Sequence, residues 1–160
     1  IFCVDKLNDY KIDDRINFLN KLTNNLQNIN YDFYGFKNKE PIWGNNFYQA
    51  LVNSKMGLNL SRGLPTKYYS SNRIASLIWN GLLTFIDKKT EIDDFFSKNE
   101  IIFYSNINDL SDKIMFYSKN DKIRKKISKN GKKKYFKLFN ETKITKYLID
   151  VSIGNKAILY

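Results

Sequence analysis

The chain has 160 residues, of which 42% are hydrophobic, and its formal net charge is +11. This length fits one domain that can bury a core without disulfides or structural metals. The sequence contains no histidine, so it lacks the commonest general base and zinc ligand, and hydrolases that pair a nucleophile with histidine are disfavoured.

The opening residues, 2–4, form an apolar run that predicts a buried strand. Cys3 is the one cysteine in the sequence, which indicates a buried thiol and a reducing compartment. We find no secretory signal and no apolar span of about 18 residues. We therefore expect a cytoplasmic protein, either soluble or peripheral to the inner face of the membrane. Because Ile1 is not preceded by methionine, we also expect a piece of a longer polypeptide.

The first half of the chain alternates helical patterns with apolar runs. The spacing predicts a helix over 12–26, whose first turn carries acidic residues as helix N-termini favour. Strands are expected over 31–36 and 56–60, with a short helix over 45–53 between them. The apolar positions that define the first helix are Ile12, Ile16, Leu19, Leu22 and Leu26.

The second half continues the same alternation. The sequence predicts a helix over 71–79, which Gly81 ends because glycine readily takes a left-handed conformation. Strands are expected over 82–86 and 101–104, with a helical turn over 91–96 between them.

Helices fill the C-terminal part of the chain. Asn108 or Asp109 is expected to cap a helix that runs to Tyr117. Two further helices are expected in 121–150, with a hinge near Gly131 or Asn140.

Five strands that alternate with helices predict a parallel sheet with right-handed crossovers. The expected fold class is therefore α/β, a Rossmann-like three-layer sandwich with about five parallel strands and extra C-terminal helices. Ligands of such sheets bind outside the carboxyl ends of the strands. The residues that follow strand ends, and so define the expected binding rim, are Asp5, Lys6, Gly35, Ser61, Arg62 and Asp87.

The segment between the third strand and the next helix has the features of a phosphate site. A helix N-terminus attracts anions through unpaired N–H groups and its dipole. Arg62, Lys67 and Arg73 add positive charge there. Gly63 permits close backbone approach, while Ser70, Ser71 and Asn72 can bond phosphate oxygens; alternatively these three merely cap the helix and the cations are solvated.

Most of the net charge lies between Lys119 and Lys137, where ten Lys or Arg residues stand against one acid, Asp121. Such a block can bind nucleic acid, anchor to anionic lipid, or form a solvated helix face. The near-helical spacing of Ile123, Ile127, Tyr135 and Leu138 favours the solvated face, with the other side of the helix docked on the core.

The order and spacing of several stretches resemble the C-terminal half of a GT-B glycosyltransferase, of the group-1-like kind with a spore-protein-type glycosyltransferase domain. The resemblance covers residues from about 2 to 150. The stretches that carry it are N-F-Y-Q-A-L-V-N-S-K-M-G-L-N-L-S, Y-Y-S-S-N-R-I-A-S-L-I-W-N-G-L-L-T-F-I-D, E-I-I-F-Y-S-N-I-N-D-L-S-D-K-I-M-F-Y and R-K-K-I-S-K-N-G.

The resemblance implies that residues 1–160 form one donor-binding domain of a longer two-domain enzyme. A nucleotide-sugar would lie on the rim, and an N-terminal half would hold a glycan or lipid-linked acceptor and the catalytic residues. This domain alone would be nearly inactive, and neither a metal nor another cofactor is expected. The family's R-x-x-E motif, whose glutamate commonly bonds the ribose, is represented by Arg73 and Ser76. Because the acid is missing, Asn72 or a residue near Asp87 is expected to substitute.

A second hypothesis treats the block from Lys119 to Lys137 as the functional element. The protein would then be a non-enzymatic module that binds RNA or an anionic membrane. Nucleic acid is the less favoured partner of the two.

Overall fold

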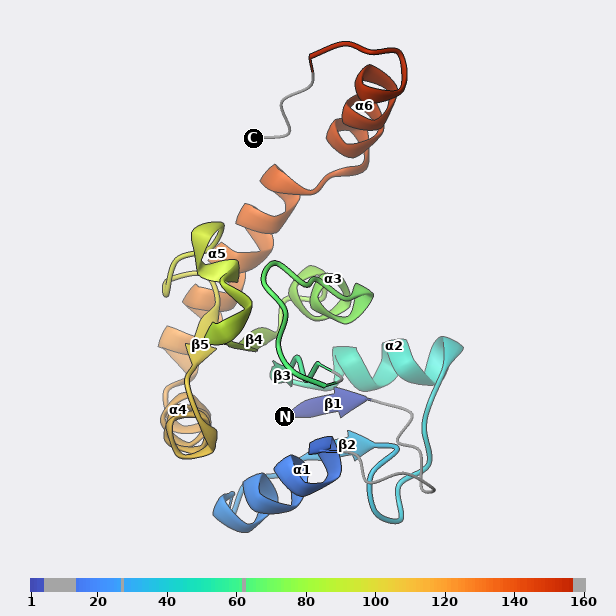
Figure 1. The fold of residues 1–160 in the computed structure, drawn as a ribbon. Helices are drawn as coiled ribbons and strands as arrows, with labels where there is room; N and C mark the ends of the chain where they lie inside the picture. Colours follow the sequence, from blue (N-terminus) through green and yellow to red (C-terminus); the bar gives the residue numbers. More distant parts are fainter. Residues whose placement is uncertain (5–13, 27, 62, 157–160) are drawn as a thin grey trace.

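The computed structural model describes residues 1–4, 14–26, 28–61 and 63–156, and these form a five-stranded parallel sheet between two layers of helices (Figure 1). The strand order is β2-β1-β3-β4-β5, and every neighbouring pair is parallel. The predicted α/β Rossmann-like sandwich is therefore confirmed. The strands are β1 (Phe2–Val4), β2 (Asp32–Tyr34), β3 (Met56–Leu58), β4 (Leu83–Asp87) and β5 (Ile102–Tyr104).

Helices cover both faces of this sheet. Helices α1 and α4 pack on one face, while α2 and α3 pack on the other (Figure 1). Helix α5 contacts α3, α4 and β4, and α6 extends away from the sheet. The bounds are α1 (Asp14–Asn25), α2 (Gly44–Val52), α3 (Asn72–Trp79), the 3-10 helices η1 (Lys88–Thr90) and η2 (Ile92–Asp94), α4 (Ile107–Lys119), α5 (Asp121–Leu138) and α6 (Glu141–Ser152).

The core is divided by the sheet because successive strand residues point to opposite faces. In β1, Cys3 packs in the cluster that contains Leu19 and Leu22 of α1, while Phe2 packs with Leu51 and Leu77 on the other face. Strand β4 is buried on both faces, as its largely apolar sequence predicts. Packing against both helical layers therefore fixes the positions of the strands, and the strand ends in turn position the loops at the carboxyl edge.

One predicted helix boundary is wrong, and one predicted alternative is resolved. Helix α4 starts earlier than expected, because Asn106 rather than Asn108 or Asp109 is its cap, and the Asn106 side chain accepts the N–H of Asp109 at 3.0 Å. The hinge between the last two helices was predicted near Gly131 or Asn140; α5 runs unbroken through Gly131, and the break is confirmed at Asn140, which caps α6.

Gly131 has a different role from a hinge. A Cβ atom at this position would lie 2.2 Å from the carbonyl oxygen of Glu100, so only glycine lets α5 approach the segment before β5 this closely. The helical turn expected over 91–96 forms the shorter helix η2.

The predicted stop after α3 is confirmed at Gly81, whose φ is +77°. The N–H of Leu82 bonds the carbonyl of Leu77 at 3.1 Å, and the N–H of Gly81 bonds that of Ile78 at 3.0 Å. This is the pattern of a Schellman motif, which turns the chain directly from α3 into β4. Among the described residues, no helix has both the length and the apolar composition needed to cross a bilayer.

Candidate functional site

The strand order places a topological switch point between β1 and β3. From β1 the chain crosses to β2 on one side, whereas β3, β4 and β5 follow on the other side. In sheets of this order, a crevice opens outside the carboxyl ends of the two strands at the switch point. Because α1 follows β1 and α3 follows β3, the amino termini of both helices are directed to this edge, where they favour a bound anion.

The start of α3 is tied to the end of β3 by two side chains. Ser71, the residue before α3, donates its hydroxyl to Oδ1 of Asn59 at 3.1 Å. Arg73 donates from Nη1 to the carbonyl oxygen of Leu60 at 2.5 Å. Ser71 does not bond an N–H of its own helix, so the expectation that it caps α3 with its side chain is wrong. The side chain of Asn59, which is only 2% exposed, accepts the hydrogen bond of the Ser71 hydroxyl instead.

A small cavity of about 140 Å³ lies at this edge of the sheet. Since a water molecule takes about 30 Å³ of liquid volume, the cavity has room for a phosphate-sized group but not for a whole nucleotide-sugar. It is bordered by the first turn of α1, by the loop after β3, and by the ends of β4 and β5. The lining residues are Asp14, Arg15, Phe18, Leu60, Ser61, Gly63, Pro65, Asp87 and Tyr104.

Two arginines bring positive charge to this region. Arg15 is only 4% exposed and lines the cavity from the first turn of α1. Burial raises the pKa of the Cys3 thiol to about 11, and the charges of Arg73 and Arg15 both act against that rise. Both guanidinium charges therefore act on β1 beside the switch point, where Asp14 and Asp87 also bring carboxylates to the cavity wall.

The loop between β3 and α3 is fastened to the segment that follows β4. Tyr68, with a φ of +57°, donates its N–H to Thr90 at 2.7 Å and its hydroxyl to Asp94 at 2.5 Å. Lys67 forms an ion pair with Glu91 at 2.5 Å, and the hydrogen bond to Glu91 raises the pKa of Lys67. Lys67 is therefore engaged on the η1 side of the loop and does not line the cavity beside Arg15.

The other predicted site residues occupy several positions. Gly63, whose φ is +68°, and Asp87 line the cavity; the Asp87 carboxylate also accepts the N–H of Lys89 at 2.9 Å. Ser70 and Asn72 are exposed, the latter as the first residue of α3. Ser76 donates its hydroxyl to the Asn72 carbonyl within α3. Asp5, Lys6 and Arg62 lie outside the described residues, and Gly35, with a φ of +78°, closes β2.

Sequence reasoning missed Arg15 and Asn59, although each has a visible signal. Arg15 shares the helical spacing of Leu19, Leu22 and Leu26, so it is a charge on the buried stripe of α1. Asn59 is the one polar residue in the run from Met56 to Leu60. A polar or charged residue at a core position requires a partner or a function. Tyr104 is also missed; burial, followed by the charges of Asp87 and Cys3, raises its pKa.

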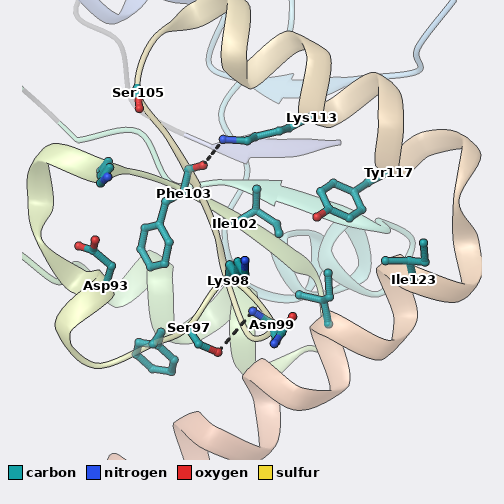
Figure 2. A pocket seen from close by; sticks show the side chains of 13 residues that line it. Asp93, Ser97, Lys98, Asn99, Ile102, Phe103, Ser105, Lys113, Tyr117 and Ile123 are labelled. Carbon is teal, nitrogen blue, oxygen red and sulfur yellow. Dashed lines mark hydrogen bonds between the residues drawn. The ribbon is translucent and has the colours of Figure 1, made fainter.

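A larger cavity of about 710 Å³ lies away from the switch point, beyond the edge strand β5 (Figure 2). It is walled by α4, α5 and the loop before β5, with Ile102, Phe103 and Tyr117 among its apolar residues. Lys113, which reaches into its wall, already donates to the Phe103 carbonyl at 2.8 Å. None of the residues predicted to bind phosphate lines this cavity, so its size alone does not make it the candidate site.

The strand order and the helices that follow β1 and β3 define a doubly wound α/β domain whose switch-point cavity is lined by Arg15. A family model described as "Glycosyl transferase-like" matches residues 15–150. The match spans most of the chain, so this protein belongs to that glycosyltransferase family. No curated protein and no solved structure matches the chain. Within the described ranges, no three His, Cys, Asp or Glu side chains gather as metal ligands would.

Proposed function

We propose that this chain is the nucleotide-sugar donor-binding domain of a two-domain GT-B-type glycosyltransferase, and that the donor's diphosphate binds at the switch point between β1 and β3. The family match supports glycosyl transfer in general. The single observation that carries the finer proposal is the cavity at the carboxyl edge, which Arg15 lines and beside which Arg73 bonds the end of β3. Its size suits one phosphate-sized group, so the rest of the donor would lie in the open space above the rim.

The proposed contribution to catalysis is electrostatic. When the bond from sugar to diphosphate breaks, negative charge grows on the departing nucleoside diphosphate. Arg15, Arg73 and the amino termini of α1 and α3 are positioned to stabilise that charge, and donors fixed in advance do so without reorganising. Because these positive groups can stabilise the charge of the diphosphate, we propose that no bound metal is needed. Asp87, in the cavity wall, can accept hydrogen bonds from donor hydroxyl groups.

The remaining parts of the reaction are assigned to a second domain. The sequence contains no histidine, and the described cavity contributes two carboxylates, Asp14 and Asp87, as its acidic groups. We propose that an N-terminal domain supplies the catalytic base and holds a glycan or lipid-linked acceptor. This chain alone is then expected to bind a donor but to transfer sugar very slowly.

A thermal-shift panel of the common nucleoside diphosphates against this chain tests the proposal. A nucleotide at a hundred times its dissociation constant should stabilise the fold by about 2.7 kcal/mol. For a chain of this size that corresponds to a rise in Tm of about 5–11 °C. If none of the nucleotides raises the Tm, donor binding by this domain is wrong.

Two variants connect any binding to the proposed residues. Arg15→Met and Arg73→Met each remove a charged donor that is worth about 1.5–3 kcal/mol, so the affinity for the nucleotide should fall about 10- to 150-fold. The matched control is Lys133→Gln, which removes one charge from exposed α5 and should leave the affinity unchanged. The Tm of each variant without nucleotide shows whether it is folded. Equal losses in all three variants would indicate a general effect of charge and contradict the assignment.

A further inference from the structure

Tyr104, the last residue of β5, carries a hydroxyl group that the fold itself does not use. The side chain is 2% exposed, yet it lines the switch-point cavity. Within the part of the chain that the structure describes, no group forms a hydrogen bond with this hydroxyl. Among the same residues, the fully enclosed side-chain polar atom without a hydrogen bond is Nε of Arg124, so the Tyr104 hydroxyl is not sealed inside the protein. It therefore reaches the cavity, where a bound group can become its partner.

The sheet places Asp87 beside Tyr104. The two residues are register partners at the ends of β4 and β5, and paired residues of neighbouring parallel strands point to the same face. Oδ1 of Asp87 accepts the N–H of Lys89, and the second carboxylate oxygen can accept a further hydrogen bond. Burial, followed by the charges of Asp87 and Cys3, raises the pKa of Tyr104, so the phenol stays protonated at neutral pH and can donate. A neutral donor and a charged acceptor thus lie side by side in one wall of the cavity.

A hydroxyl group is the ligand chemistry that satisfies both residues at once. Its oxygen accepts from Tyr104 while its proton is donated to Asp87, whereas a phosphate oxygen without a proton would be repelled by the Asp87 carboxylate. The charged side chains of the wall are one arginine, Arg15, and two carboxylates, Asp14 and Asp87, so a neutral polar group is favoured there over a second anion. The ring of Phe18, whose centroid lies 6.2 Å from that of Tyr104, adds apolar surface for the C–H groups of a sugar ring.

We infer that Tyr104 and Asp87 form a subsite for a sugar hydroxyl of the nucleotide-sugar, in which Tyr104 donates to the hydroxyl oxygen and the hydroxyl donates to Asp87. The inference rests on the proposed function, which places the diphosphate at the same cavity beside Arg15. The ribose of the nucleotide and the transferred sugar are both joined to the diphosphate. A hydroxyl of either one can therefore reach the cavity wall while the rest of the donor lies above the rim. Tyr104 is a positioning residue and takes no part in bond breaking.

Two other partners of the Tyr104 hydroxyl agree less well with these observations. A second domain that closes over the rim would meet the mouth of the cavity and not this hydroxyl, because almost the whole side chain is buried. A bound water could satisfy the hydroxyl in the free protein. Water alone, however, gives Tyr104 no influence on ligand binding, and that difference can be measured.

Calorimetric titration of this chain with ligands of increasing size tests the inference. The ligands are pyrophosphate, then UDP, GDP, ADP, CDP and dTDP, and then these nucleotides with glucose attached. Tyr104→Phe should leave pyrophosphate binding unchanged and weaken binding of the hydroxyl-bearing ligand about 2- to 12-fold, the effect of one neutral hydrogen bond. A loss already present with the nucleoside diphosphate identifies the ribose as the source of the hydroxyl. A loss seen only with the glucose conjugate identifies the transferred sugar.

Two comparison variants separate the Tyr104 hydroxyl from other effects. Arg15→Met should weaken the binding of pyrophosphate as well as of the larger ligands, because all of them contain the diphosphate. Tyr117→Phe removes the hydroxyl of a partly buried tyrosine that lines the other cavity, beyond β5, and should bind every ligand like the wild type. Without ligand, the Tm of Tyr104→Phe should equal or exceed that of the wild type, since no internal hydrogen bond is lost.

The possible failures of the two proposals are distinguishable. If the wild type binds none of these ligands, the proposed function fails and the inference fails with it. If the wild type binds them, the inference alone is overturned by any of three results: Tyr104→Phe binds every ligand equally well, it loses pyrophosphate affinity to the same extent as nucleotide affinity, or its Tm without ligand falls below that of the wild type.

Discussion

The hydroxyl of Ser71 and the buried side-chain oxygen of Asn59 lie 3.1 Å apart, and this hydrogen bond joins the residue before α3 to the end of β3. The main-chain N–H of Asn59 in turn bonds the Phe85 carbonyl of β4 at 3.0 Å. The amino terminus of α3 is therefore positioned by the sheet itself, and a ligand bound there would meet a preorganised helix end.

Replacing Asn59 should disturb both stability and binding. Asn59→Ala removes a buried side chain and leaves Ser71 without its acceptor, so the free energy of unfolding should fall by about 1–3 kcal/mol. Nucleotide affinity should fall as well, because the start of α3 loses its attachment. Urea unfolding and nucleotide titration measure the two effects. Ser70→Ala, at an exposed neighbouring residue, is the control, and a similar loss in that variant would contradict the role of Asn59.

Gly131→Ala should destabilise the protein although alanine is the better helix former. Alanine gains about 1 kcal/mol of intrinsic helix propensity. Its Cβ, however, would meet the main-chain oxygen of Glu100 at 2.2 Å, and forcing α5 away from that segment should cost about 1–3 kcal/mol beyond the gain. Thermal unfolding compares this variant with Lys129→Ala, an exposed change in the same helix that should stay within about 0.5 kcal/mol of wild type. An increase in Tm for Gly131→Ala would show that the contact is not tight.

The Cys3 thiol should resist alkylation while the protein is folded. Burial raises its pKa to about 11, and the side chain is 2% exposed, so both the thiolate population and access are low at pH 8. Mass spectrometry after iodoacetamide treatment should show little modification of the native protein and complete modification in urea. Rapid alkylation without denaturant would mean that β1 opens readily.

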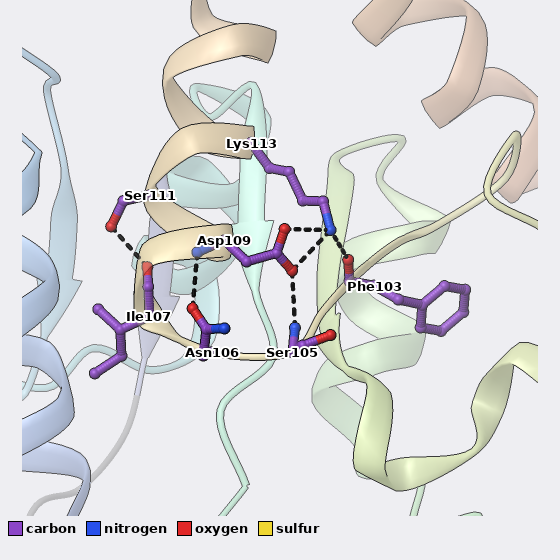
Figure 3. A network of polar contacts seen from close by, with 7 residues as sticks. All are labelled: Phe103, Ser105, Asn106, Ile107, Asp109, Ser111 and Lys113. Carbon is purple, nitrogen blue, oxygen red and sulfur yellow. Dashed lines mark hydrogen bonds and ion pairs between the residues drawn. The ribbon is translucent and has the colours of Figure 1, made fainter.

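Stability should depend on the ionisation of Asp109, whose carboxylate lies in a polar network before and within α4 (Figure 3). Burial acts to raise the pKa of Asp109, but the hydrogen bonds from Lys113 and the Ser105 N–H outweigh it and hold the pKa below its ordinary value. A carboxyl whose pKa is lower in the folded state contributes stability at neutral pH, and that contribution is lost as the pH falls through its folded-state pKa.

Asp109→Asn tests this dependence. The variant should be less stable than wild type at pH 7. The difference in stability should shrink as the pH falls below about 4, because the wild-type carboxyl then becomes protonated and, like the amide, carries no charge. Urea unfolding across this range gives the comparison. Asp112→Asn, which removes an exposed acid from the same helix, is the control and should stay within about 0.5 kcal/mol of wild type at pH 7. A difference that stays constant with pH would mean that Asp109 acts through shape and not through charge.

The fold was predictable because its signals are local. Each strand is a short run rich in apolar or aromatic residues, and Gly81 marks the end of α3 through a conformation that glycine adopts easily. The α4 boundary was not predictable, since Asn106, Asn108 and Asp109 are all good caps and only the three-dimensional position of the preceding strand selects among them. Gly131 looked like a hinge because its contact with Glu100 spans 31 residues of sequence, a separation that helix patterns do not reveal.

The position of the candidate site in the fold was predictable from the sequence, but the set of residues that line it was not. The expected rim at the carboxyl edge contains Ser61 and Asp87, which do line the cavity, as does Gly63 of the predicted phosphate loop. Lys67 was expected beside Arg73, yet its partner Glu91 comes from a segment whose packing the sequence does not reveal. Arg15 was overlooked because a charge in the first turn of a helix is usually solvated.

The outer edge of the sheet has a further consequence for how the protein behaves at high concentration. Strand β5 ends the sheet, and two backbone groups at this border are occupied: Lys113 bonds the Phe103 carbonyl at 2.8 Å, and just past the strand Asp109 accepts the Ser105 N–H at 2.9 Å. An exposed strand edge is a template on which other chains can polymerise. By occupying these groups with charged side chains, α4 protects the protein against fibril-like self-association at that border.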